Sequence, residues 1–254
     1  MLTSSSLGRK EQGFNAVKVN GTGDTAWLDT PAVLTEVVER LKAVRALGLD
    51  VAVDFHGRVH KPMAKRLARA LEPFDVLFIE EHLLSEHPGG IEQLSELVTL
   101  PIALGERIHS RWDVRPFLEN GSVDILQPDI CHVGGISEMR RIDSACETYD
   151  VAVAPHCPLG PIALAANIQV DTTLPNFAIQ EIGIGMHYNS TGHDITSYIT
   201  NPEVWNVQDR YIEILSGPGL GVNINEDEIR RLSKDTDSWP VPEFRGPCGE
   251  LREW

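Results

Sequence analysis

The stretch VAVDFHG, residues 51–57, reads as a buried strand that ends in an acid and a histidine just before a glycine. Its first three residues suit an interior strand, whereas Asp54 and His56 are costly to bury unless something binds them. A strand that delivers two ionisable side chains at its carboxyl end predicts a functional site at that end of a sheet.

Short apolar runs alternate with longer amphipathic segments on both sides of this stretch. The predicted strands are 15–20, 51–56, 76–81, 101–106, 124–129, 151–156 and 177–182. The predicted helices are 31–48, 62–74, 89–100, 110–121, 134–150 and 161–173. Unbroken strand–helix alternation with apolar strands predicts a parallel sheet covered by helices.

Two architectures fit that alternation, a TIM-type barrel and an open doubly wound sheet. An ionisable residue falls at or near the carboxyl end of each predicted strand: Lys18, Asp54, Glu80, Glu106, Asp129, His156 and Glu181. A barrel mouth takes one such group from every strand. An open sheet usually carries a glycine-rich phosphate turn, and no GxGxxG or GxxxxGK[ST] follows a strand here. The sequence therefore predicts an α/β TIM-type barrel and argues against nucleotide binding.

Composition narrows the class of protein. The 254 residues are 42% hydrophobic and 23% charged, which is typical of a globular protein. The formal net charge of -15 argues against a nucleic acid or an anionic membrane as partner. Four cysteines without a CxxC pair, Cys131, Cys146, Cys157 and Cys248, predict reduced thiols in a cytoplasmic protein.

Asp54, Glu80 and Glu106 end three consecutive predicted strands and would converge in a barrel. Each acid alone could instead cap a helix or form an ion pair. Three carboxylates brought together repel one another, and a divalent cation removes that repulsion. Ligands that are all oxygen favour a hard ion such as Mg²⁺.

His56 shares a strand face with Asp54, and His156 follows a later strand. A lone histidine is more often a core imidazole bonded to backbone. Asp129, however, ends the strand before His156 and could bond its ring, which would fix the tautomer and raise its basicity. Two imidazoles beside a metal predict proton abstraction next to a carboxylate, followed by elimination or by racemisation.

Several stretches resemble the enolase superfamily, in its mandelate racemase/muconate lactonizing branch. They include VKVNG (17–21), DFHGRV (54–59), LFIEEH (77–82), ALGERIHSRWD (103–113), ILQPDICHVGGI (125–136) and APHCPLGPIALAA (154–166). The resemblance runs from about residue 13 to the end. It implies Mg²⁺-dependent dehydration of a sugar acid, with D-galactonate as the expected substrate, one Mg²⁺ per subunit and homo-oligomeric relatives.

Carried over residue by residue, the resemblance implies a complete set of roles. Asp54, Glu80 and Glu106 would bind Mg²⁺, His156 with Asp129 would be the base, His56 would be the acid, and Glu181, Lys18, Asn20 and Arg58 would bind substrate. Asn20 stands where racemases of this branch carry the second lysine of a Lys-x-Lys pair, which favours dehydration over racemisation.

The sequence departs from the family pattern in two respects. His82 replaces a usual proline, and neither the capping domain nor the first barrel strand of relatives is recognisable. We expect residues 1–12 to be a truncated remnant, 13–183 a partial barrel carrying the catalytic residues, and 184–254 a C-terminal extension packed on it. The missing parts predict weak or absent activity for this chain alone, unless a partner covers the gap. A dehydratase for another aldonic acid and an inactive barrel with a binding role remain alternatives.

Overall fold

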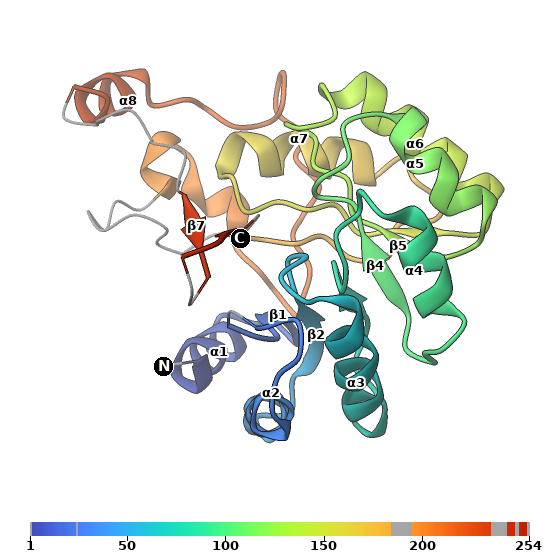
Figure 1. Cartoon of the computed structure of the whole chain (residues 1–254). Coiled ribbons are helices and arrows are strands. Elements are labelled where there is room, and N and C mark those ends of the chain that lie inside the picture. Colours follow the sequence, from blue (N-terminus) through green and yellow to red (C-terminus); the bar gives the residue numbers. More distant parts are fainter. Residues whose placement is uncertain (1, 24, 184–194, 235–242, 247–248, 253–254) are drawn as a thin grey trace.

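The structure is a computed structural model of the chain (Figure 1). It describes residues 2–23, 25–183, 195–234, 243–246 and 249–252. The ribbon shows the helices arranged around a central group of strands (Figure 1).

Within the described residues, six parallel strands form the sheet in chain order. They are β1 (Ala16–Asn20), β2 (Asp50–Asp54), β3 (Ile79–Glu80), β4 (Ile102–Leu104), β5 (Ile125–Leu126) and β6 (Ala152–Val153). Each strand pairs with the next along the chain, and all these pairs are parallel. This order, with a helix after each strand, is consistent with a TIM-type barrel and confirms the predicted fold class.

The predicted seventh strand, 177–182, is reduced to a single parallel bridge between Val153 and Phe177. Beyond residue 178, side chains make several of the contacts to the preceding segment. The Gln180 amide donates to Pro155 O at 3.0 Å, and the Glu181 carboxylate accepts from Cys157 N at 3.0 Å. The apolar pattern therefore located the segment correctly but overstated its main-chain pairing.

In the part of the chain that the structure describes, seven α-helices accompany the sheet, and an eighth lies in the C-terminal region. They are α1 (Leu2–Glu11), α2 (Pro31–Arg45), α3 (Lys61–Leu71), α4 (Pro88–Ser95), α5 (Arg111–Glu119), α6 (Ile136–Thr148), α7 (Pro161–Asp171) and α8 (Glu226–Leu232). Short 3-10 helices occupy Glu72–Phe74, Ile195–Tyr198 and Pro202–Trp205, and β7 (Phe244–Arg245) pairs antiparallel with β8 (Leu251–Arg252).

The helices bury an apolar stripe against the sheet. On α2, Val37, Leu41 and Val44 recur at helical spacing and are all buried. Each such side chain contributes about 1.5–3 kcal/mol relative to an exposed one. Proline at the first or second position of α2, α3, α4 and α7 fixes where these helices begin.

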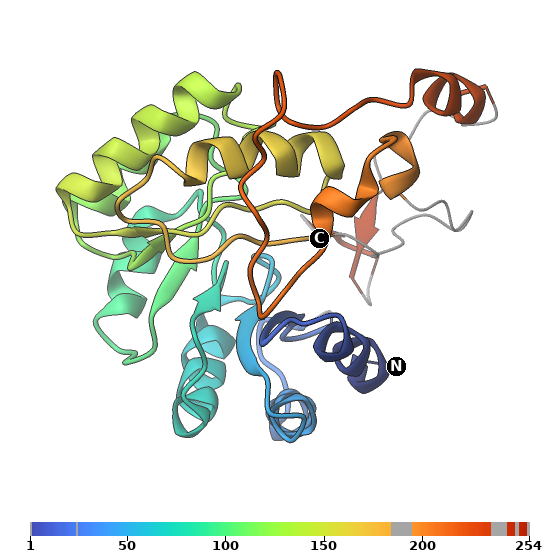
Figure 2. The same cartoon turned by 180° about the vertical axis from the view of Figure 1, so that it is seen from behind.

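The C-terminal region packs along the same core. Ile199, Trp205 and Leu215 belong to the main buried cluster, and Gln169 of α7 donates to Leu215 O at 2.9 Å. Gly13, just before β1, packs against Val207. The segment from Trp205 to Leu215, which belongs to the orange-to-red part of the ribbon, therefore runs between the start of β1 and α7 (Figure 2). The division of the chain at residues 12 and 183 stays a prediction.

Two further findings concern the thiols and the length of the helices. Cys131, Cys146 and Cys157 are free thiols, while Cys248 lies outside the described residues. Within the described ranges, no helix combines the length and apolar character needed to span a bilayer.

Candidate active site

Three acids are buried where consecutive strands end. Asp54 is the last residue of β2, Glu80 the last of β3, and Glu106 follows β4. All three are buried. Since the strands are parallel, these acids lie at one end of the sheet, as the sequence predicts.

Lys18 of β1 reaches into this group of acids. Its Nζ lies 2.7 Å from Glu80 Oε1, 3.0 Å from Glu181 Oε1 and 4.0 Å from Asp54 Oδ2. Burial lowers the pKa of Lys18, but the three carboxylates outweigh it and hold that pKa above its usual value. Burial also raises the pKa of Glu80 to about 7. The ammonium group of Lys18 thus neutralises part of the acidic charge gathered here.

His56 is tied to Asp54 by two contacts. Asp54 Oδ1 accepts from His56 N at 2.8 Å, and Asp54 Oδ2 lies 2.6 Å from His56 Nδ1. A backbone φ of 52° at His56 turns the chain back so that its ring meets the preceding acid. Burial opposes charge on both groups, yet the shared hydrogen bond raises the pKa of His56 and lowers the pKa of Asp54.

His156 lies between two carboxylates. Its Nδ1 is 2.8 Å from Asp129 Oδ2, and its Nε2 is 3.3 Å from Glu106 Oε2. Burial lowers the pKa of His156, but the hydrogen bond to Asp129 and the nearby acids raise it above its usual value. Asp129 therefore fixes the ring through Nδ1 and leaves Nε2 as the nitrogen that can exchange a proton with a bound molecule.

Two groups of side chains in the described residues bring enough ligand atoms together for a metal ion. Asp54, His56 and Glu106 form one, and Asp129, His132 and His156 form the other, with ligand atoms within 4.8 Å of one another in each. Glu80 belongs to neither group. Instead, Lys18 Nζ lies between the two acids, 2.7 Å from Glu80 Oε1 and 4.0 Å from Asp54 Oδ2.

The predicted substrate-binding residues divide into two sets. Glu181 and Lys18 join the buried acids through the contact described above. Asn20 is exposed at the end of β1, where its carbonyl accepts from Arg40 Nη1 at 3.3 Å. Arg58 lies half-buried in the turn after β2, and its carbonyl accepts from Thr25 Oγ1 at 3.2 Å.

Three further residues of this site are not predicted from the sequence. Gln127 Nε2 donates to Glu80 Oε2 at 2.9 Å, and His132 Nδ1 lies 2.9 Å from Glu106 O. Glu81 is fully buried beside Glu80. Gln127 could have been found, because it stands two residues before Asp129 and strand alternation places both on one face.

His82, which the family resemblance places at a proline position, is also buried. Burial lowers the pKa of His82 to about 4, so its ring is neutral at physiological pH. This substitution therefore adds no positive charge to the acids beside it.

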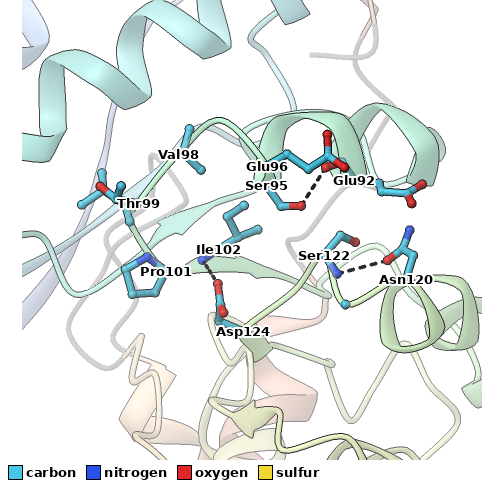
Figure 3. Close-up of a pocket in the computed structure, with 12 residues that line it drawn as sticks. Glu92, Ser95, Glu96, Val98, Thr99, Pro101, Ile102, Asn120, Ser122 and Asp124 are labelled. Atoms are coloured by element: carbon cyan, nitrogen blue, oxygen red, sulfur yellow. Dashed lines mark hydrogen bonds between the residues drawn. The ribbon is translucent and has the colours of Figure 1, made fainter.

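A hollow of about 410 Å³ lies at the opposite end of the sheet (Figure 3). It is lined by residues before β4 and β5, including Pro101 and Asp124. Asp124 accepts from Ile102 N at 2.8 Å, a contact that holds the strands together. Functional groups in such barrels gather at the carboxyl ends of the strands, so we place the candidate active site there and not in this hollow.

Residues 4–228 match the enolase C-terminal domain-like family. The D-galactonate dehydratase of Variovorax paradoxus is 42% identical over 247 residues, which are 96% of this chain and 64% of that protein. The chain thus spans less than two thirds of the length of this curated relative.

Solved structures give the same result. A member of the enolase superfamily from Salmonella Typhimurium superposes with a TM-score of 0.78 at 28% identity, over 91% of this chain and 60% of that one. A mandelate racemase/muconate lactonizing enzyme-like protein from Rubrobacter xylanophilus gives 0.81 at 28% identity, over 90% and 60%. With most of its length matched, the chain belongs to the enolase C-terminal domain-like family.

Proposed function

We propose that the chain carries the catalytic barrel of a sugar-acid dehydratase that converts D-galactonate to 2-dehydro-3-deoxy-D-galactonate. The observation that carries this proposal is the pair of histidines beside one carboxylate cluster. His156 is held by Asp129 and faces Glu106, and His56 is held by Asp54. The relatives named D-galactonate dehydratase support the choice of substrate.

The donor set fits Mg²⁺. Carboxylate oxygens are the ligands that this ion prefers, and Glu106 Oε2 is buried and accepts no hydrogen bond from any described residue. We assign Asp54, Glu80 and Glu106 as the residues that would hold one ion. When bound, Mg²⁺ supplies positive charge beside the substrate carboxylate and so eases loss of the neighbouring proton.

The histidines divide the proton transfers between them. In its neutral form, His156 takes the proton from C2 at Nε2, because Nδ1 is committed to Asp129. Protonated His56 gives a proton to the C3 hydroxyl, which leaves as water. The resulting enol then becomes the 2-keto product by proton transfer from solvent.

The remaining residues bind and orient the sugar acid in this proposal. Glu181 would hydrogen-bond the substrate carboxylate as charge builds there, and Lys18 lies 3.0 Å from Glu181. Asn20, which ends β1, and Arg58, which follows β2, would contact the carbon chain of the sugar acid beyond its carboxylate. In this proposal the chain assembles as a homo-oligomer in the cytoplasm.

A product assay tests the proposal. The purified chain is incubated with Mg²⁺ and each of a panel of aldonic acids, and 2-keto-3-deoxy acids are measured. We expect product from D-galactonate and none from the His156→Asn variant. Product from a different aldonic acid alone would change the substrate, and no product together with no Mg²⁺ binding by calorimetry would favour a binding role.

A further inference from the structure

Glu81 is a buried acid with no role in the reaction proposed above. It follows Glu80 at the end of β3, is fully buried, and has a backbone φ of 42°. A non-glycine residue in this left-handed region is uncommon and is kept only when the surrounding structure holds it there. Its contacts show what holds it.

Three hydrogen bonds join Glu81 to the two neighbouring strand ends. Its main-chain N donates to Ala103 O of β4 at 3.1 Å, and its carbonyl accepts from Gly57 N, after β2, at 2.7 Å. Its Oε1 accepts from Gly105 N at 3.1 Å. The carboxyl ends of β2, β3 and β4 are therefore tied together at this one residue.

These are the strand ends that carry the three proposed Mg²⁺ ligands. Gly57 lies shortly after Asp54, Glu81 directly follows Glu80, and Gly105 directly precedes Glu106. At Gly105, φ is +149° and an added Cβ would come within 2.6 Å of the Gln127 backbone. The main chain before Glu106 is thus confined on one side by Gln127 and bonded on the other by Glu81.

We propose that Glu81 is a positioning residue for the metal site: by holding Gly105 it fixes the place of Glu106 beside Asp54, whose ligand oxygen lies within 4.8 Å of that of Glu106. This inference rests on the proposed function. Residues that orient metal ligands typically change metal affinity about 10- to 100-fold when replaced.

Mg²⁺ affinity, measured by calorimetry on folded protein, tests the inference. Glu81→Met keeps the length of the side chain and removes the acceptor of Gly105 N, so we expect affinity to fall about 10- to 100-fold. Glu81→Gln keeps an oxygen at the same place and should bind Mg²⁺ nearly as the unmodified chain does. Glu81→Asp keeps the acid but withdraws it by one methylene, and should lose affinity as Glu81→Met does.

Asp143→Asn is the matched control, because Asp143 is an equally buried acid that lies on α6. It should leave Mg²⁺ affinity unchanged. Circular dichroism identifies the variants that are folded. If Glu81→Met does not fold, the comparison of Mg²⁺ affinity between Glu81→Asp and Glu81→Gln tests the positioning role. Unchanged affinity in both Glu81→Met and Glu81→Asp would overturn the positioning role. Absence of Mg²⁺ binding by the unmodified chain would instead overturn the metal site itself.

Discussion

At His156, one ring nitrogen faces Asp129 and the other faces Glu106. This placement favours the doubly protonated ring, which is why the pKa of His156 is raised despite its burial. A base must be neutral before it can accept a proton. In the proposed reaction the enzyme would therefore gain activity as pH rises through the pKa of His156.

Asp129→Asn should lower that pKa. It removes the hydrogen bond and negative charge that raise the pKa of His156, so we expect that pKa to fall toward the usual value of an imidazole. The acidic limb of turnover should move to lower pH, while the rate falls about 10²- to 10⁴-fold because the ring is no longer held in its productive form. NMR titration of the ring and a pH–rate profile measure the two effects. A pKa of His156 that stays unchanged would contradict this account.

Lys18→Met should destabilise the chain most strongly when divalent ions are absent. Removal of the ammonium group leaves buried carboxylates uncompensated, which costs about 3 kcal/mol or more in the free energy of unfolding. Saturating Mg²⁺ should reduce the difference in the free energy of unfolding between Lys18→Met and the unmodified chain. Thermal unfolding in EDTA and in Mg²⁺ measures it.

Lys42→Met is the control, since Lys42 also lies 2.7 Å from a glutamate, Glu39, but at an exposed position of α2. Exposed pairs contribute about 0–1 kcal/mol. An equal loss in the two variants, or a Lys18→Met loss that ignores Mg²⁺, would argue against the charge compensation described above.

Much of the site was readable at the level of single residues. One ionisable residue ends each apolar run in a chain where strands and helices alternate, and this pattern alone predicts that Asp54, Glu80 and Glu106 lie at one end of the sheet. The sequence carries no comparable sign of which acid faces which cation. The pairing of Lys18 with Glu80, and the absence of Glu80 from both groups of candidate ligands, depend on three-dimensional placement.

At the scale of elements, the strands are shorter than their apolar runs predict. β3 is only Ile79–Glu80, and the chain turns at once through the left-handed Glu81. Residue patterns give apolar runs but not such turns. The helix α1 was missed for another reason, because LTSSSLGRKE lacks the apolar stripe by which amphipathic helices are found.

The interface of α6 and α7 contains a pH-dependent contribution to stability. Asp143 of α6 is buried, its carboxyl oxygens accept no hydrogen bond from the residues that the structure describes, and burial raises its pKa to about 7 from 3.8. Arg140 opposes that shift. Asp171 ends α7, and its pKa is raised to about 8 by burial and by Asp143.

Asp143→Asn should therefore stabilise the chain at high pH. The folded state binds the Asp143 proton more tightly than the unfolded state, so its stabilising effect is complete below pH 3.8 and is lost as pH rises to about 7. The variant cannot ionise at this position, and at pH 8 we expect it to be about 2–4 kcal/mol more stable than the unmodified chain. Unfolding at pH 4 should show little difference. Parallel pH curves for the two proteins would refute this.

At the scale of the whole molecule, the C-terminal region shares its core with the barrel. Leu215 lies in the same buried cluster as the strands, and its carbonyl accepts from Gln169 of α7. If this shared core sets the stability of both, the C-terminal region and the barrel unfold together.

Leu215→Ala should lower the free energy of unfolding of the whole chain by about 2–3 kcal/mol, because it leaves a cavity in the common core. Denaturant unfolding followed by circular dichroism and by tryptophan fluorescence should give one coincident, shifted transition. The control is Leu28→Ala, since Leu28 is 74% exposed and should have little effect. A second transition that alone responds to Leu215→Ala would show that the region folds separately.

Among the described strands β1 pairs with β2 alone, so one side of β1 is an edge of the described sheet. Such edges invite self-association by strand addition. The formal net charge of -15 opposes the approach of two copies, and that repulsion is long-ranged only in dilute electrolyte. Self-association should therefore depend on ionic strength. Sedimentation velocity should find small species in dilute buffer and larger ones as added sodium chloride shortens the screening distance.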